Sequence, residues 1–413
     1  MSRRVVVTGL GAVTPIGIGK EEFWKALKIG KSGVGPITSF DTEGFTSKIA
    51  GEVKDWEPKD YMEPKEAKRT DRYNQFSYAA AQMAAEDSGI DFDNIDKKRA
   101  GVILGVGMGG LNTYEDQMKV YNKKGPRRVT PFLVPMMISN LSAGTVAIKY
   151  GLMGPNYVVT AACASSTHAI GEAFLKIKNS MCDICFTGGA ESTITPLTVA
   201  GFASMKALST RNEEYSIASS PFDNKRDGFV IAEGAGIIVL EELEHAKARG
   251  AKIYGEVLGY GLSDDGFHMT QPHPDGAGAT MCMQNAIDMA GIKPEDVDYI
   301  NAHGTSTPFN DRLETKAIKN VFGDHAQKVA ISSTKSMTGH LLGGAGGVEA
   351  IACLFAIENN IIPPTINYQD PDPDCDLNYT PNSFIEREVK YAISNSFGFG
   401  GQNSTIVLGK YEN

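Results

Sequence analysis

The sequence predicts an α/β fold made of two similar halves. Short segments rich in valine and isoleucine alternate with longer, alanine-rich segments of helical period, and this alternation is typical of α/β proteins. Two pairs of segments also repeat at matching offsets in the first and second parts of the chain, as expected when one structural unit occurs twice. With 413 residues and 42% hydrophobic side chains, the chain is long enough for one large domain or two packed halves.

The first half supplies the clearest elements. Residues 5–8 are predicted to form a first strand that ends in a glycine turn. Further strands and helices follow from the same two periodicities. The strands are expected at 102–104, 158–160 and 184–187, and the helices at 76–88 and 169–178.

Two internal similarities predict the second half. QMAAEDSGI (82–90) and QNAIDMAGI (284–292) share Gln, Ala, an acid and Gly-Ile, and each is expected to close a helix that leads to a strand. GAGIIVLEEL (234–243) and NSTIVLGKY (403–411) are expected to be the last strand of each half. The basic stretch HAKARGAK (245–252) is predicted as the boundary. The halves are therefore residues 1–250, which carry the reactive cysteine discussed below, and 251–413, which carry two histidines.

The bulk composition predicts a cytoplasmic protein. A net charge of -9 argues against general nucleic-acid binding, which needs a positive field. No segment approaches the ~18 to 20 apolar residues of a membrane helix, and the amino terminus lacks the length and composition of a signal peptide. The six cysteines are spread thinly, as in a reducing compartment rather than in a disulfide scaffold.

One local cluster of positive charge departs from the acidic whole. In EPKEAKRTDRYNQF (63–76), basic residues recur at i, i+3, i+4 and i+7, which predicts that they share one helix face. They are Lys65, Lys68, Arg69 and Arg72. A solvated helix face is one interpretation, and a docking patch for an acidic partner is the other.

The stretch GVGMGG (105–110) matches the dinucleotide-binding pattern G-x-G-x-x-G and follows a predicted strand. No second strand ending in Asp or Glu follows about 20 residues later, as that pattern requires. A nucleotide site is therefore not expected. A glycine-lined wall with Met108 projecting into a cavity explains the glycines as well.

Two other motifs resemble metal sites, but the rest of the sequence offers no further ligands at the spacing that such sites need. Cys182 and Cys185 form a C-x-x-C pair, but no second pair or histidine cluster at zinc-finger spacing accompanies them. The apolar residues around them predict a buried strand instead. His268 and His273 in GFHMTQPHPDG are interpreted as loop residues rather than metal ligands.

Cys163 is the candidate nucleophile. In VVTAACASSTHAIG (158–171) it stands between a β-branched run and a string of small residues. A free cysteine in an apolar setting is usually a small hydrophobe. Because Cys163 ends a strand and begins a helix, the positive end of the helix dipole is expected to lower its pKa.

Two stretches of the second half place histidines beside hydroxyl-rich and glycine-rich segments. NAHGTSTPFND (301–311) has His303 at the end of a short strand. STKSMTGHLLGGAGGVEA (333–350) carries Lys335 and then His340 before an apolar helix. Two histidines can donate hydrogen bonds to a developing enolate or thioester oxygen.

A tight glycine turn, NSFGFGGQN (395–403), precedes the last strand, and its amides can form an oxyanion hole. Thr305 and Thr307 can hydrogen-bond a polar carrier arm. Together with Cys163 and the histidines, these groups predict a cysteine acyl-enzyme with two catalytic histidines.

The four quoted stretches, in this order, resemble the signature blocks of the β-ketoacyl-acyl carrier protein synthases over essentially the whole chain. The resemblance is closest to the type II elongating condensing enzymes of fatty acid biosynthesis. It implies a thiolase fold of two similar βαβαβαββ halves in a layered α-β-α-β-α arrangement. It also implies a cytoplasmic, homodimeric acyltransferase that requires no organic cofactor.

The resemblance implies a role for each site residue. Cys163 takes the acyl chain from acyl carrier protein, and His303 and His340 promote decarboxylation of malonyl-acyl carrier protein and stabilise the enolate. The amides of Cys163 and Phe399 form the oxyanion hole. The remaining implied roles are gating of the acyl pocket by Phe399, a supporting charge on Lys335, support of the loop by Asp311 and Glu314, lining of the pocket by Met108 and Phe202, and contact with the phosphopantetheine arm by Thr270, Thr305 and Thr307.

Two further sites follow from the resemblance alone. Acyl carrier protein is strongly acidic, so its expected landing site is Lys65, Lys68, Arg69 and Lys206. Members of the family can also hold a structural monovalent or divalent cation. The corresponding positions here are Asn301, the Ala302 carbonyl, Glu349, Ser394 and Asn395.

Some related activities are disfavoured and others stay open. Histidine at both catalytic positions argues against the type III synthases, which pair Cys and His with Asn. Cys375 lies in a loop without the glycine turn that holds the second cysteine of thiolases. A specialised polyketide-type ketosynthase and a non-catalytic carrier-protein scaffold remain alternatives. Leu133, Phe309 and Arg312 leave the acyl preference open.

Overall fold

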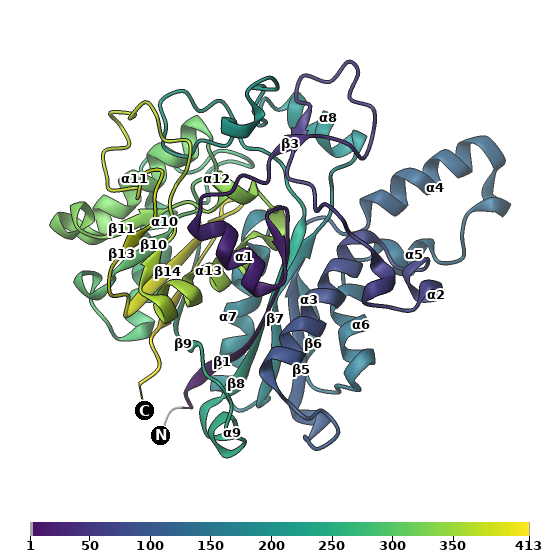
Figure 1. The fold of residues 1–413 in the computed structure, drawn as a ribbon, viewed down its shortest axis with the longest axis horizontal. Coiled ribbons are helices and arrows are strands. Elements are labelled where there is room, and N and C mark those ends of the chain that lie inside the picture. The colour runs from purple at the N-terminus through teal and green to yellow at the C-terminus, as the bar shows by residue number, and fades with distance from the viewer. Residues whose placement is uncertain (1–2, 413) are drawn as a thin grey trace.

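A computed structural model describes residues 3–412 of the chain. Most strands belong to one mixed sheet (Figure 1). The strands are β1 (Val5–Thr14), β2 (Gly17–Ile18), β3 (Gly35–Pro36), β4 (Ile49–Ala50), β5 (Ala100–Gly105), β6 (Asn156–Val159), β7 (Ile184–Glu191), β8 (Gly234–Glu242), β9 (Gly255–Asp264), β10 (Tyr299–Asn301), β11 (Ala330–Ser332), β12 (Ile361–Ile362), β13 (Ile385–Glu386), β14 (Tyr391–Phe397) and β15 (Gln402–Gly409). The helices are α1 (Lys20–Lys28), α2 (Pro64–Ala67), α3 (Arg72–Ser88), α4 (Leu111–Lys124), α5 (Leu133–Met137), α6 (Leu141–Tyr150), α7 (Ser165–Lys178), α8 (Pro196–Ser204), α9 (Leu243–Ala248), α10 (Ala277–Ala290), α11 (Pro308–Phe322), α12 (Lys335–Thr338) and α13 (Ala345–Asn359).

The large sheet consists of two sets of strands with the same topology. The first set has the order β6-β5-β7-β8-β1 and the second the order β11-β10-β14-β15-β9. In each set the first three strands are parallel and the last two pairings are antiparallel. β1 lies between β8 and β9, with Val5 opposite Val257, so one pairing joins the two sets. The predicted α/β fold of two similar βαβαβαββ units is confirmed.

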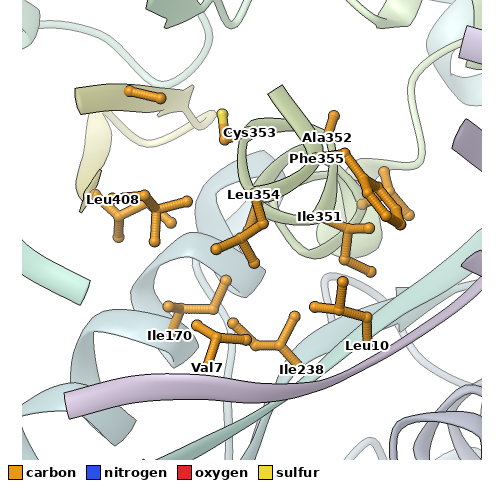
Figure 2. Close-up of a cluster of buried hydrophobic side chains, with 14 of the residues drawn as sticks. Val7, Leu10, Ile170, Ile238, Ile351, Ala352, Cys353, Leu354, Phe355 and Leu408 are labelled. Atoms are coloured by element: carbon orange, nitrogen blue, oxygen red, sulfur yellow. The ribbon is translucent and has the colours of Figure 1, made fainter. Parts of the chain in front are cut away.

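The helices cover the sheet on both outer faces and fill the space between the two sets (Figure 1). α3 and α6 pack on the first set, and α10 packs on the second with α11 beside it. α7 and α13 contact strands of both sets. α13 is buried on every side along residues 345–357, as expected for a helix that is apolar all round. Figure 2 shows its Ile351 and Leu354 packed near Leu10 and Ile238 in the central core.

The first strand does not end in the predicted glycine turn, because β1 continues through those glycines. Gly11 faces α3, where an added Cβ would lie 2.0 Å from the carbonyl oxygen of Ala80. Gly261 of β9 repeats this contact with α10, since its Cβ would lie 2.0 Å from the carbonyl oxygen of Cys282. In both halves, therefore, glycine permits a helix to pack against the strand at very short range.

The remaining element predictions agree with the structure. The segments 82–90 and 284–292 close α3 and α10, and both helices end at a left-handed glycine, Gly89 and Gly291. The segments 234–243 and 403–411 fall on β8 and β15, which close the first and second halves in chain order. The predicted strands fall on β5, β6 and β7, and the predicted helices fall on α3 and α7.

Two further predictions concern the boundary between the halves and membrane-spanning segments. The basic stretch 245–252 lies between β8 and β9, where the first set of strands ends, and part of it forms α9. Among residues 3–412, no helix combines the length and the apolar character needed to cross a membrane.

Candidate active site

A pocket of about 730 Å³ is lined by residues from both sets of strands and their loops. It brings together ten of the predicted site residues, although they come from distant parts of the chain. They are Met108, Cys163, Phe202, Lys206, Thr270, His303, Thr305, Thr307, His340 and Phe399.

Cys163 lies in a short turn, Ala162–Ala164, between β6 and α7. Ala162 has a φ of +46°, which is uncommon for any residue other than glycine. At the equivalent place in the second half, Leu342 has a φ of +47° and opens the turn Leu342–Gly344 before α13. Such strained conformations persist only where the surrounding structure fixes them, and they concentrate at functional sites.

Three reactive side chains converge in the pocket. One atom from each of Cys163, His303 and His340, a sulfur and two ring nitrogens, lies within 4.8 Å of the other two. The two imidazole rings are 5.5 Å apart at their centroids and nearly perpendicular. Both histidines are buried, whereas Cys163 is half-buried at the pocket surface.

The hydrogen bond that His340 accepts determines which of its two ring nitrogens carries the proton. The backbone N–H of Leu342 donates to Nδ1 of His340 at 3.2 Å, so the neutral ring carries its proton on Nε2. This Nε2 is buried and has no hydrogen-bond partner among the described residues. A sulfur and two imidazoles are also zinc ligands, but a metal would need Nε2 without its proton. The arrangement therefore favours donation to a substrate oxygen over metal binding.

Burial controls the charge of the two histidines. It lowers the pKa of His303 and of His340 well below the usual value, and the nearby Lys335 ammonium lowers both further. Lys335 is itself buried and pairs with Glu349 of α13. Both imidazoles are therefore neutral donors near pH 7.

The pKa of Cys163 contradicts the expectation drawn from its position before a helix. Burial raises the pKa of the thiol to about 12, while Lys335 and the backbone N–H of Phe399 oppose the rise. The loss of solvent at the sulfur outweighs the favourable charge of Lys335, and the Glu191 carboxylate adds to the rise. The resting side chain is therefore a thiol.

Phe399 belongs to the glycine turn between β14 and β15. Its backbone N–H and that of Cys163 both lie against the sulfur. Its ring continues a row of aromatic contacts along the pocket, with centroid distances of 6.4 Å to Phe202 and 5.2 Å from Phe202 to Phe229. Phe229 in turn contacts His340 edge-on at 5.4 Å.

The loop after His303 is fixed by a buried carboxylate. Glu314 of α11 accepts the backbone N–H groups of His303 and Gly304, both at 2.8 Å. The hydroxyls of Thr305 and Thr307 lie 3.0 Å apart at the pocket wall. The loop therefore presents two hydroxyls from a rigid support.

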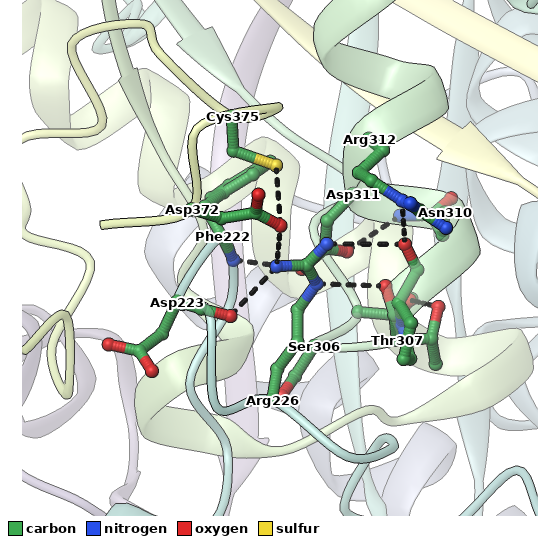
Figure 3. Close-up of polar contacts among 12 residues, drawn as sticks. Phe222, Asp223, Arg226, Ser306, Thr307, Asn310, Asp311, Arg312, Asp372 and Cys375 are labelled. Carbon is green, nitrogen blue, oxygen red and sulfur yellow. Dashed lines mark hydrogen bonds and ion pairs between the residues drawn. The ribbon is translucent and has the colours of Figure 1, made fainter. Parts of the chain in front are cut away.

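A buried arginine that the sequence did not single out also holds this loop (Figure 3). Arg226 donates to the carbonyl oxygens of Thr307 and Pro308, both at 3.2 Å. Its guanidinium also lies 2.6 Å from Asp372 and 3.5 Å from Asp311. Arg226 stands among other charged residues in DNKRDG, so no sequence pattern marks it as buried.

The predicted basic helix face is only partly correct. Lys65, Lys68 and Arg69 are exposed, but α2 ends at residue 67 and a turn separates it from α3. Arg72 begins α3 and instead pairs with the buried Glu233 at 2.7 Å. The helix breaks because Asp71 caps the start of α3, where its side chain accepts the backbone N–H of Tyr73.

The positions expected to hold a cation carry oxygen atoms that lack partners. Oδ1 of Asn301, Oε2 of Glu349 and Oγ of Ser394 are buried without a hydrogen bond among the described residues. Asn301 and Ser394 lie opposite each other on β10 and β14. Ala302 follows Asn301 in the buried loop, whereas the side-chain oxygen of Asn395 already accepts from Thr405.

The other two candidate metal motifs lie at a buried strand and in a loop. Cys182 and Cys185 are fully buried, and Cys185 lies on β7, as predicted. His268 and His273 lie in the loop between β9 and α10, also as predicted.

The chain matches two family models that together cover most of its length. The model described as the N-terminal domain of beta-ketoacyl synthase matches residues 2–246, and the model described as the C-terminal domain matches residues 254–369. A 3-oxoacyl-[acyl-carrier-protein] synthase 2 from Synechocystis sp. is 51% identical over 99% of both chains. One of the same name from Coxiella burnetii is 50% identical, again over 99% of both.

Solved structures with the same fold are ketosynthases. The ishigamide ketosynthase/chain length factor superposes with a TM-score of 0.94 at 38% identity over the full length of both chains. A type II polyketide ketosynthase solved in complex with its acyl-carrier protein gives 0.92 at 38% identity, also over both full lengths. These likenesses confirm the thiolase fold and its layered arrangement.

Proposed function

The chain belongs to the beta-ketoacyl synthase family, and on that premise we propose that it is a condensing enzyme of type II fatty acid synthesis. It transfers an acyl chain from acyl carrier protein to Cys163 and condenses it with malonyl-acyl carrier protein. The products are 3-oxoacyl-acyl carrier protein, CO2 and free carrier protein. The observation that carries the proposal is the convergence of Cys163, His303 and His340 within 4.8 Å in one pocket.

In the first half-reaction, Cys163 exchanges its proton for an acyl group. The sulfur forms a bond to the carbonyl carbon of the acyl thioester, and the N–H groups of Cys163 and Phe399 donate to the oxygen that becomes negative. The bond to the carrier sulfur then breaks. The proton of the thiol ends on the carrier sulfur, so the step is neutral overall.

In the second half-reaction, the malonyl thioester binds with its carbonyl oxygen against His303 and His340. The bond to the terminal carboxylate breaks, CO2 leaves, and the electron pair forms an enolate whose oxygen accepts from the histidines. The enolate carbon forms a bond to the thioester carbon on Cys163, the carbon–sulfur bond breaks, and the sulfur leaves as a thiolate that takes a proton from water to return to the resting thiol. The charge of Lys335 stabilises that thiolate, because it lowers the pKa of Cys163.

Intact-mass analysis after incubation with acyl-carrier proteins of graded length tests the proposal. We expect the wild type to gain one acyl group and Cys163→Ala to gain none. Cys282→Ala, which removes a buried cysteine of α10 outside the pocket, should be acylated like the wild type. Acylation of Cys163→Ala would overturn the assignment of the nucleophile.

A specialised polyketide-type ketosynthase is the second candidate, because a solved type II polyketide ketosynthase shares the fold at a TM-score of 0.92. Its 38% identity is lower than the 51% of the curated relative, which favours the first candidate. Dependence on a dedicated partner subunit would favour the second. A scaffold without activity would leave malonyl-acyl carrier protein undecarboxylated.

Acyl carrier protein is the proposed partner. Its acidic surface suits the exposed Lys65, Lys68 and Arg69, and Lys206 lies at the pocket wall. A similar ketosynthase has been solved with its acyl-carrier protein bound. The six free cysteines of the chain support a cytoplasmic location, where thiols stay reduced.

A second copy of the chain is proposed at the free edge of β6. Among residues 3–412, β6 pairs with β5 alone, which leaves a row of backbone groups for another strand. Ile148 and Met153, which are near β6 in the chain, are 78% and 64% exposed. Light scattering should give twice the mass of one chain, and Ile148→Glu should reduce it to one. A wild-type monomer would exclude this homodimer.

A structural cation is proposed at Asn301, Ala302, Glu349, Ser394 and Asn395. The unpartnered oxygens of three of these side chains support it, because hard cations prefer oxygen ligands. Asn395 would contribute a backbone oxygen, since its side chain is already bonded. Added potassium or magnesium should raise the unfolding midpoint of the wild type but not of Ser394→Ala.

A further inference from the structure

Glu191, the last residue of β7, is a buried carboxylate that the proposed reaction does not use. It lines the same pocket as Cys163 and His340. Among the described residues it forms no ion pair with a lysine, arginine or histidine. A buried carboxylate without a counter-ion is costly unless hydrogen bonds satisfy its oxygens, so its partners identify its role.

The partners of Glu191 are backbone N–H groups from two separate turns. Gly107 donates at 2.8 Å, and Met108 and Gly109 donate at 3.2 Å. Gly343 donates from the other turn at 3.2 Å. Three successive N–H groups that point to one centre form a concave anion-binding nest.

This nest explains the glycine-rich stretch 105–110 that resembles a nucleotide-binding motif. The motif binds an anion, but the anion is the carboxylate of the protein itself. A Cβ on Gly107 would lie 2.5 Å from Oε2 of Glu191, and a Cβ on Gly343 would lie 2.7 Å from the same atom. Any side chain at Gly107 or Gly343 would therefore collide with the Glu191 carboxylate.

Each of the two turns carries a group at the pocket. The first turn carries Met108, which lines the pocket and is 44% exposed. In the second turn, Gly343 follows Leu342, whose N–H fixes the proton of His340 on Nε2. Leu342 has the strained φ of +47°, a conformation that needs support from its neighbours. The bond from Gly343 to Glu191 supplies that support one residue away.

We propose that Glu191 is a positioning residue for the condensation, a role that rests on the proposed function. Its carboxylate ties the turn of Met108 to the turn behind His340, and so sets both the wall of the acyl pocket and the donor that faces malonate. Burial raises the pKa of Glu191 to about 7, and the N–H groups of the two turns oppose the rise. The N–H groups of both turns are therefore the contacts that stabilise the charged form of Glu191.

The test compares two buried carboxylates that both accept backbone N–H groups. Glu191→Gln keeps the shape of the side chain but turns an amide group toward the nest. Glu52→Gln is the matched control, because Glu52 accepts the N–H groups of Thr38 and Ser39 at 3.0 to 3.1 Å and lies outside the pocket lining. Both variants are measured for unfolding midpoint, malonyl-carrier decarboxylation and acylation by acyl-carrier proteins of graded length.

We expect both variants to lose stability, but only Glu191→Gln to change function. Its decarboxylation rate should fall about 10- to 100-fold, because small displacements of catalytic groups are this costly, and its preferred acyl length should shift. Glu191→Asp, which keeps the charge but shortens the side chain, should be intermediate.

Wild-type rate and acyl preference in folded Glu191→Gln would overturn the inference. If that variant does not fold, an unchanged acyl preference in Glu191→Asp overturns it instead. Absence of acylation in the wild type would refute the proposed function, which is a different result.

Discussion

The backbone N–H of Leu342 donates to Nδ1 of His340 at 3.2 Å and so makes Nε2 a proton donor toward the pocket. The proton is fixed by the fold before any substrate binds. His340 is therefore expected to act on the malonyl oxygen and not on the thiol of Cys163.

Replacement of His340 by alanine should separate the two half-reactions. Loss of one donor to a developing oxyanion costs about 10²- to 10³-fold, so malonyl decarboxylation should fall by this factor while Cys163 is still acylated. His340→Gln retains an N–H donor and should keep part of the activity. Release of CO2 and intact mass report the two steps, and an equal loss of both in His340→Ala would contradict this division.

Reversal of charge on the proposed docking surface should weaken carrier binding only. Lys68→Glu is expected to raise the KM for malonyl-acyl carrier protein about fivefold, which corresponds to about 1 kcal/mol. The difference should shrink in high salt, because exposed charges are screened. Lys25→Glu on α1 reverses another exposed charge and serves as the control. The KM for a small malonyl thioester should stay unchanged in both variants.

Arg226 should matter far more for stability than its neighbour Arg312 (Figure 3). Arg226→Met leaves Asp311 and Asp372 without their buried partner and should cost about 3–5 kcal/mol of unfolding free energy. Arg312 is exposed and pairs with Asp374 at 3.5 Å, so Arg312→Met should cost less than about 1 kcal/mol. Urea unfolding measures both, and comparable losses would argue against the buried cluster as a clamp on the loop.

The two close strand–helix contacts should be equally intolerant of a methyl group. Gly11→Ala and Gly261→Ala each place a Cβ 2.0 Å from a helix carbonyl oxygen, so each should cost about 1–3 kcal/mol through overpacking. Gly201→Ala on α8 meets no atom within 4 Å and should stabilise by roughly 0.5–1 kcal/mol. Thermal unfolding of the three variants gives the comparison. Tolerance of alanine at either strand position would show that the layers can separate.

Glu314→Gln should change how stability depends on pH. Burial raises the pKa of Glu314 from 4.5 to about 7, so between these values the folded state binds more protons than the unfolded state. The wild type therefore loses stability from this group as pH rises from 4.5 to 7, and glutamine does not.

The unfolding free energy of Glu314→Gln minus that of the wild type should rise over this interval by on the order of 3 kcal/mol. Denaturant unfolding at pH 5 and pH 8 measures the difference. The lowered pKa values of His303 and His340 act in the opposite direction, but they are common to both proteins and cancel. A difference that is constant with pH would show that Glu314 does not titrate in this range.

The fold and the reactive cluster were predictable because their signals are local. Alternating and helical periodicities mark the strands and helices, and Cys163, His303 and His340 each stand in a short motif of reactive and small residues. The repeated unit places two of these near one centre, since Cys163 lies in the turn Ala162–Ala164 before α7 and His340 lies just before the equivalent turn Leu342–Gly344 that precedes α13.

What the sequence could not predict depends on contacts between distant segments. Gly11 has the local pattern of a turn, but its role is set by a helix carbonyl on α3. Arg72 continues a basic periodicity, but it pairs with Glu233, 161 residues away. Glu191 and Arg226 have no local pattern, because their importance comes from partners that only the folded chain supplies. The prediction that the pKa of Cys163 is lowered was wrong, because the burial of its side chain cannot be read from one segment of sequence.

The position of β1 between β8 and β9 also has a consequence for synthesis on the ribosome. β1 emerges well before the two strands that flank it, because β8 begins at residue 234 and β9 at residue 255, and only Val13 and Thr14 pair earlier, with β2. At about 5–20 residues per second, β1 waits roughly 10–50 s before either flanking strand exists. During that interval most of an apolar strand lacks its partner strands, so this enzyme should depend on chaperones early in translation and be free of them once residue 264 has emerged.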